Sequence, residues 1–271
     1  MRLWALVAVG LAAGGVVACS KIEAKGVDLA PHKAVYAMRL ASAQGGSGIA
    51  GANGEMTYEF GDACDGWTVE NRTVLNFAYN EGANVATVWD FSTWESKDGL
   101  RYRFRVRSTR DGEVTEEIDG SATLKGKGKS GVAIFTKPEA LTLDLPEGTI
   151  FPTEHTVDLL KTAQDGKPML AKVLFDGTST DGPFDVTAFI GKPAAANDNS
   201  APPLGSSLLT GPSWHMDLAF FPIKGQQASP DYEVGLRYQD NGIARDILQN
   251  FGNFTLRGQL DKVEALKKPE C

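Results

Sequence analysis

Apolar and polar residues alternate along most of the chain after residue 54, which is the pattern of half-buried β-strands. In "EMTYEF", residues 55–60, Met56, Tyr58 and Phe60 share one face and the polar residues share the other. Similar segments are found at 67–79, 85–94, 100–107, 132–136, 141–145, 170–175, 184–190, 214–221, 232–238 and 254–260. Asp-Gly and Asn-Gly pairs, which favour tight turns, separate many of them. The pattern predicts a mainly β, antiparallel fold.

One segment has helical spacing instead. Residues 152–166, "PTEHTVDLLKTAQDG", place Val157, Leu160 and Ala163 on one face, with Thr153 as the expected N-cap and Gly166 as the stop. We expect an amphipathic helix whose apolar stripe covers a face of the sheet. Residues 243–251 are compatible with either a strand or a short turn of helix.

Two glycine- or proline-rich segments are predicted to be loops. Residues 42–54 are small and glycine-rich, and residues 191–207 have the composition of a mobile surface loop, expected to extend to about residue 212. Strands of the same style flank the second segment, so we expect one domain over residues 28–271 with a long loop in it.

The N-terminus has the features of an export signal. Arg2 precedes an uncharged apolar run from Leu3 to Ala18, which is short and glycine-rich for a membrane span. Residues 1–19 are therefore interpreted as a signal peptide, and the mature chain is not expected to span a membrane. Two processing routes stay open: cleavage after Ala18, or lipidation of Cys19, which follows a loose lipobox.

Export also changes the interpretation of the cysteines. Without Cys19, the chain has two, Cys64 and Cys271, and a pair in an oxidising compartment favours a disulfide. Two free thiols are the alternative. No Cys-x-x-Cys motif or Cys/His cluster is present, so the sequence predicts no metal site.

Charge and motifs exclude several function classes. The net charge of −7 argues against nucleic acid as a partner. "GSGIAG" at 46–51 has dinucleotide-motif spacing, but a strand pattern follows where a helix is required. No nucleophile elbow is present. His155 is expected to be a capping or exposed residue, and His215 to lie on the outer face of a strand. We expect no catalytic residue and no cofactor.

The most unusual feature is an arginine stripe. In "LRYRFRVR", Arg101, Arg103, Arg105 and Arg107 project from one strand face while apolar residues project from the other. Four like charges in a row repel one another unless they have partners. Cross-strand acids are one explanation, with Asp90, Glu95, Glu113 and Glu117 as candidates. Recognition of anionic groups, for example on envelope lipid, is the other.

Several segments together resemble the periplasmic cell-envelope integrity protein B family, formerly a domain of unknown function. They are "PHKAVYAMRL", "GANGEMTYEFGDACDGWTVENR", "LPEGTIFPTEHTVDLL", "LFDGTSTDG" and "YEVGLRYQDNGIARDILQNFGNFTLRGQL". The resemblance implies a single open, spiral-like, half-barrel antiparallel sheet wrapped around one helix, with a disulfide between Cys64 and Cys271. It also implies a role in maintaining the envelope under stress, and it transfers no catalytic residues.

The resulting hypothesis is a non-catalytic, monomeric periplasmic protein, soluble or tethered through Cys19, that binds an envelope protein or lipid. The alternatives are a lipid or lipoprotein carrier and, ranked last, an envelope-polymer hydrolase. Five aromatic residues are candidates either for an acyl-chain site or for plain core: Trp67, Phe77, Trp89, Phe104 and Phe220.

Overall fold

The computed structural model describes residues 26–194, 206–225 and 228–271. The first half of the chain is a run of strands: β1 His32–Ala43, β2 Ile49–Asp62, β3 Gly66–Tyr79, β4 Val85–Ser96, β5 Arg101–Arg110, β6 Glu113–Leu124, β7 Gly131–Lys137 and β8 Leu141–Leu145. The second half holds β9 Thr149–Ile150, α1 Pro152–Gln164, β10 Met169–Leu174, β11 Phe184–Ala194, the 3-10 helix η1 Ser207–Leu209, β12 Ser213–Pro222, β13 Tyr232–Gln239, β14 Ala244–Asn250 and β15 Phe254–Ala265.

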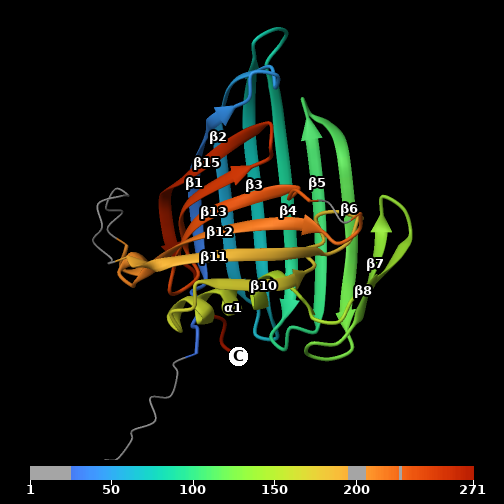
Figure 1. Ribbon diagram of the computed structural model, residues 1–271, viewed down its shortest axis with the longest axis vertical. Coiled ribbons are helices and arrows are strands. Elements are labelled where there is room, and N and C mark those ends of the chain that lie inside the picture. Colours follow the sequence, from blue (N-terminus) through green and yellow to red (C-terminus); the bar gives the residue numbers. More distant parts are fainter. Residues whose placement is uncertain (1–25, 195–205, 226–227) are drawn as a thin grey trace, which may run out of the picture.

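All described strands belong to one sheet, which curls so that its two halves face each other (Figure 1). The order is β8-β7-β6-β5-β4-β3-β2-β1-β15-β14-β13-β12-β11-β10-β9. β1 and β15 therefore pair in the middle of the sheet, while β8 and β9 form its unpaired edges. Pairing is antiparallel except between the short β9 and β10. The predicted mainly β, open spiral fold is confirmed.

The helix lies at one end of this spiral, beneath β10 in Figure 1. Leu159, Leu160 and Ala163 are almost fully buried and share a core cluster with Phe60 of β2 and Met216 of β12. The helix therefore packs between the two halves of the sheet, and the sheet is wrapped around it as predicted.

Several predicted boundaries are wrong. Residues 42–54 are not one loop, because β1 reaches Ala43 and β2 begins at Ile49. Gly54 lies inside β2, where a Cβ would collide with the Val74 carbonyl of β3, so this glycine permits close strand contact.

The second predicted loop is also shorter at both ends. Residues 191–194 complete β11 and residues 207–209 form η1, whereas residues 195–205 lie outside the described part of the chain. Residues 244–250 form β14, so the ambiguous segment is a strand.

The predicted strands omit β1 and β6. In β1 the inward positions include His32 and Ala34, which weakens the apolar contrast although its burial alternates strictly at first. β6 begins with several exposed polar residues.

Candidate functional site: an interior lumen

Two adjoining chambers remain between the two halves of the sheet. The helix chamber, about 280 Å³, lies over the start of α1, and the hairpin chamber, about 370 Å³, lies beside the β14–β15 turn. Asn71, Trp89 and Gln249 line both of them. Together the chambers form a lumen in the size range of small-molecule sites.

Strand alternation places the lumen side chains. On β4, Trp89 and Phe91 point inward and stack with ring centroids 5.2 Å apart, while Asp90 between them points outward to Arg72. The opposite wall comes from β13 and β14 through Tyr238 and Gln249. Because the walls belong to distant parts of the chain, only the curvature of the sheet creates the site.

The helix chamber is rich in neutral polar groups. Its floor is the first turn of α1, with Pro152, Thr153 and Thr156. Its walls carry Tyr58, Tyr102, Tyr238, Asn71, Asn241, Thr93 and Gln249 beside apolar Leu29, Phe60, Val69, Trp89 and Phe91. Burial raises the pKa values of the three tyrosines, so their hydroxyls stay protonated at neutral pH.

The hairpin chamber is more apolar. Met56, Leu75, Leu256 and Phe251 line it, and Phe251 is 42% exposed at the β14–β15 turn. Tyr232 and Thr178 form a polar spot in its wall, where both donate hydrogen bonds to Asp176. Burial raises the pKa of Asp176, against the effect of these hydrogen bonds.

The lumen lining carries no formal charge in the described residues. No Asp, Glu, Lys, Arg or His lines either chamber. A neutral lining with apolar walls and hydroxyl and amide groups suits an uncharged amphiphile better than an ion, because an unpaired buried charge is costly.

A buried carboxylate fixes the floor of the lumen. Glu95 of β4 is 3% exposed and accepts hydrogen bonds from the backbone N–H groups of Thr153 (2.7 Å) and Glu154 (2.9 Å). It thereby caps α1, whose N-cap residue Phe151 makes no side-chain capping bond. The expected cap, Thr153, is wrong, since this residue lies inside the helix. Desolvation raises the pKa of Glu95 to about 7.

His155 lies next to this cap and is also buried. It is 4% exposed, so the expected exposed or capping role is wrong. Desolvation lowers its pKa to about 4. The helix has neighbours on both sides of the spiral, so a position that looks polar in the sequence is covered. His215, in contrast, is exposed and lies 3.3 Å from Asp217.

Of the five candidate aromatic residues, Trp89 lines the lumen. Trp67 stacks on Phe60 beside α1, and Lys97 lies over its ring, 3.0 Å from the centroid. Phe77, Phe104 and Phe220 are buried in the three core clusters.

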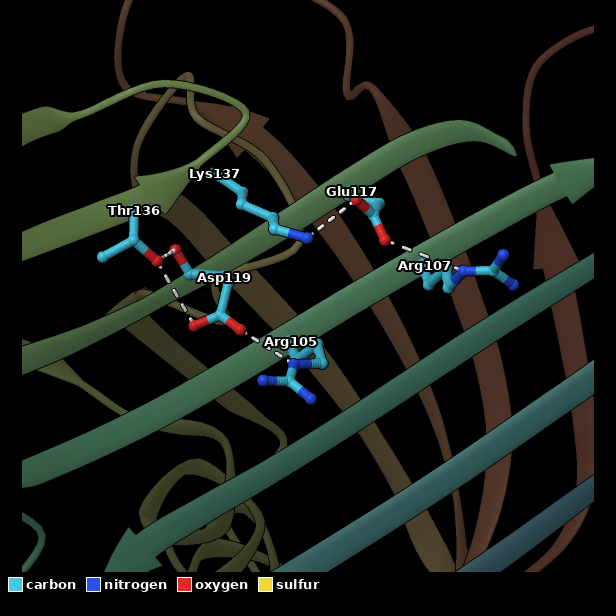
Figure 2. Close-up of polar contacts among 6 residues, drawn as sticks. All are labelled: Arg105, Arg107, Glu117, Asp119, Thr136 and Lys137. Carbon is cyan, nitrogen blue, oxygen red and sulfur yellow. Dashed lines mark hydrogen bonds and ion pairs between the residues drawn. The ribbon is translucent and has the colours of Figure 1, made fainter. Parts of the chain in front are cut away.

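The arginine stripe lies on the outer face of β5, away from the lumen. Arg105 Nε contacts Asp119 Oδ2 at 2.8 Å, and Arg107 contacts Glu117 at 3.7 Å (Figure 2). Lys137 also pairs with Glu117 at 2.8 Å. These exposed pairs neutralise charge but contribute little stability each.

Among the expected partners, only Glu117 forms an ion pair with a stripe arginine, although Asp90 lies directly opposite Arg107 in the register. Asp90 pairs with Arg72, Glu95 points inward to α1, and Glu113 lies opposite Arg110. Asp119, which lies directly opposite Arg105, was not among the candidates. Arg101 and Arg103 instead lie over the ring of Trp94, 5.5 and 5.1 Å from its centroid.

Cys64 and Cys271 form a disulfide across a sequence separation of 207 residues, with Cα atoms 5.7 Å apart. It ties the tail after β15 to the β2–β3 turn. Leu266 N–H also bonds to Pro31 O at 3.0 Å. Cys19 and the predicted signal peptide lie outside the described residues. Across residues 26–194, 206–225 and 228–271, no helix is long and apolar enough to cross a membrane, and no group of three metal-ligating side chains converges.

Comparison with known proteins decides the family. The EipB-like family model matches residues 23–267, nearly all of the described chain. The chain belongs to the EipB-like family. The resemblance seen in the sequence is thus confirmed.

Two further comparisons, one of sequence and one of structure, agree with this. The cell envelope integrity protein EipB of Brucella abortus (strain 2308) is 35% identical over 244 residues, covering 89% of this chain and 86% of that protein. A crystal structure of a β-barrel-like protein of unknown function from Brucella abortus superposes with a TM-score of 0.82. It is 33% identical, and the match covers 89% of this chain and all of that one. The EipB-like spiral is therefore shared over its whole length.

Proposed function

We propose that this chain supports cell-envelope integrity by holding an uncharged amphiphile of the envelope in its lumen, without catalysing a reaction. The observation that carries the proposal is the pair of adjoining chambers with a neutral lining. The envelope role is supported by the name of the 35% identical relative.

The two chambers suit the two ends of such a ligand. The helix chamber offers hydroxyl and amide groups to a polar head, and the hairpin chamber offers Met56, Leu75 and Leu256 to an apolar tail. Burial of apolar surface supplies the favourable free energy, while a few placed polar groups fix the orientation.

The neutral lining also supports a binding function over a hydrolase. Two carboxyl groups near the lumen, the buried Glu95 and the half-buried Asp176, are each engaged with neighbouring residues and line neither chamber. A hydrolase acting through paired carboxylates needs both at the substrate.

We further propose a periplasmic location for the mature chain, as a monomer. The export signal predicted at residues 1–19 and the Cys64–Cys271 disulfide support an oxidising compartment. Attachment through Cys19 is the alternative to a soluble form, and intact-mass measurement of the purified protein separates the two.

Ligand chemistry tests the lumen directly. Isothermal titration of the full chain with a medium-chain monoacylglycerol should give saturable binding, and the corresponding fatty acid should bind more weakly at neutral pH, because its carboxylate meets no cation. Equal or tighter binding of the anionic ligand would contradict the neutral-head assignment.

Blocking variants test the location. Gln249→Trp, at the junction of the chambers, and Thr73→Trp, on the facing wall, should each abolish binding. Ala86→Trp, at an exposed outer-face position of the strand that carries Trp89, is the matched control and should retain it. In cells lacking the native protein, the two blocking variants should fail to restore detergent resistance while the control restores it. Restoration by folded, blocked variants would refute the lumen as the functional site.

A further inference from the structure

A groove of about 490 Å³ lies on the outer face of β4 to β7, on the far side of the sheet from the lumen. The strand register builds it from one cross-strand row: Trp94 opposes Arg103, which opposes Ser121, which opposes Ile134. Ser121 is small and stands between two long side chains, so the row has a hollow at its centre. Ile134 is 49% exposed at its far end.

Trp94 holds two guanidinium groups at one end of the groove. Its indole lies against Gly66 of β3, where any Cβ would collide with Nε1 and Cε2. The guanidinium carbons of Arg101 and Arg103 lie 5.5 and 5.1 Å from the ring centroid. Stacking holds the long arginine side chains in place, which lowers the entropy cost of binding a ligand.

Arg101 and Arg103 differ from the other two arginines of the stripe. Arg105 and Arg107 have carboxylate partners, whereas Arg101 and Arg103 make no ion pair with any described residue. A guanidinium stacked on an aromatic face keeps its N–H groups free at its edge, where they match the oxygens of a carboxylate or phosphate.

The surroundings favour a discrete anionic group over a charged surface. Asp90, Glu117 and Asp119 lie on the same outer face, and the chain carries a net charge of −7. A flat anionic bilayer would meet these carboxylates as well as the arginines. Asp119 also lines the groove, but its carboxylate is paired with Arg105 at 2.8 Å, so a single oxyanion beside Arg103 meets a guanidinium that has no ion-pair partner among the described residues.

The rest of the groove offers hydroxyls and a short apolar surface. Ser121 and Thr136 are exposed beside Ile134, and Ser92 is exposed on β4. The Thr136 hydroxyl donates a hydrogen bond to the backbone carbonyl of Asp119. Exposed hydroxyl groups beside an aliphatic patch match the alternating hydroxyl and C–H surfaces of a sugar ring.

We propose that this groove binds an acidic saccharide. Arg101 and Arg103 hold the carboxylate or phosphate of the glycan, and the sugar ring lies over Ser121 and Ile134. The site is independent of the lumen and gives the protein a second contact within the envelope.

Titration of the full chain with a short oligogalacturonate tests the proposal, with glucose 6-phosphate as the phosphate-bearing probe. Binding should weaken roughly tenfold or more in Arg101→Gln/Arg103→Gln, because two charge-assisted contacts are lost. Arg72→Gln/Arg107→Gln, which removes the same charge from the outer face of the sheet outside the groove, is the matched control and should change binding less than roughly twofold.

Five outcomes would overturn the proposal. Equal weakening in both double variants would show general attraction to positive charge. Equal binding of a maltooligosaccharide would remove the role of the anion. Tighter binding of phosphatidylglycerol vesicles would point to a membrane surface, and tighter binding of an oligoglutamate would point to an acidic polypeptide. Loss of lumen binding in the same variants would show misfolding. Trp94→Leu then tests the groove in a folded protein. Oligogalacturonate should bind this variant more weakly, and unchanged binding would contradict the proposal.

Discussion

At the scale of single residues, Glu95 and His155 form a pair of opposed ionisable groups at the start of α1. The carboxyl has a pKa raised from 4.5 to about 7, and the imidazole has a pKa lowered from 6.5 to about 4. The folded state therefore favours the protonated acid and the neutral base. As pH rises from 4.5 to 6.5, Glu95 costs stability while His155 restores it, so the two effects largely cancel.

Removing one group should expose the contribution of the other. For Glu95→Gln, the free energy of unfolding relative to the native protein should rise by about 3 kcal/mol between pH 4.5 and 8, because the native protein alone must ionise a buried carboxyl. For His155→Leu, the relative stability should fall by about 3 kcal/mol between pH 4 and 7. Urea unfolding at several pH values measures both.

Glu113→Gln, at an exposed position, is the control and should give a flat difference. Parallel pH profiles for all three variants would show that neither buried group titrates as the geometry implies.

Alternation along a strand is enough to predict which face a side chain lies on. It is not enough to predict which residue lies opposite on the next strand, because that depends on the register. The period of two places all four stripe arginines on one face. Their partners depend on which residues oppose them. The turn at 111–112 places Glu113 opposite Arg110, and the irregularity between Ser108 and Thr109 then places Glu117 opposite Arg107 and Asp119 opposite Arg105. Sequence contains no local signal for that shift, so Asp119 is found only from the folded sheet.

At the scale of elements, α1 is the piece on which the lumen depends. Its termination at Gln164 and its apolar positions follow from the sequence, since Gly166 has a positive φ of 70° that suits glycine. The start of the helix cannot be predicted from the local sequence, because its cap comes from Glu95, which is far away in the chain. The lumen is likewise absent from local patterns, because Trp89 and Gln249 meet only when the sheet curls.

Truncating the helix core should loosen the whole end of the spiral. Leu160 is fully buried, so Leu160→Ala should lower the free energy of unfolding by about 2–5 kcal/mol, through lost apolar contact and a residual cavity. The neighbouring exposed Lys161→Ala should cost less than about 0.5 kcal/mol. Denaturant unfolding midpoints, compared at a constant slope, measure the loss of stability in both variants. Equal losses would contradict the role of α1 as the packed core between the two halves of the sheet.

At the scale of the whole molecule, the disulfide should be a major source of stability. The chain-entropy model gives up to about 5 kcal/mol for a loop of this length. Cys271→Ser should therefore unfold at a lower temperature than the native protein under oxidising conditions. In reductant the two proteins should unfold alike, and a difference that persists there would assign the effect to local packing of the tail.

The order of the strands gives the chain a nearly circular character. Every neighbouring pair in the described sheet joins consecutive strands, except β1 with β15. Strand pairing can thus proceed by local steps in each half, and a single long-range pairing, between β1 and β15, joins the halves. The disulfide lies beside that pairing and encloses almost the same span, so an oxidised chain keeps its first and last strands near each other even when unfolded. In the oxidised protein the search of β1 for β15 therefore becomes a short one, and the sheet refolds as if all of its strand pairings were local.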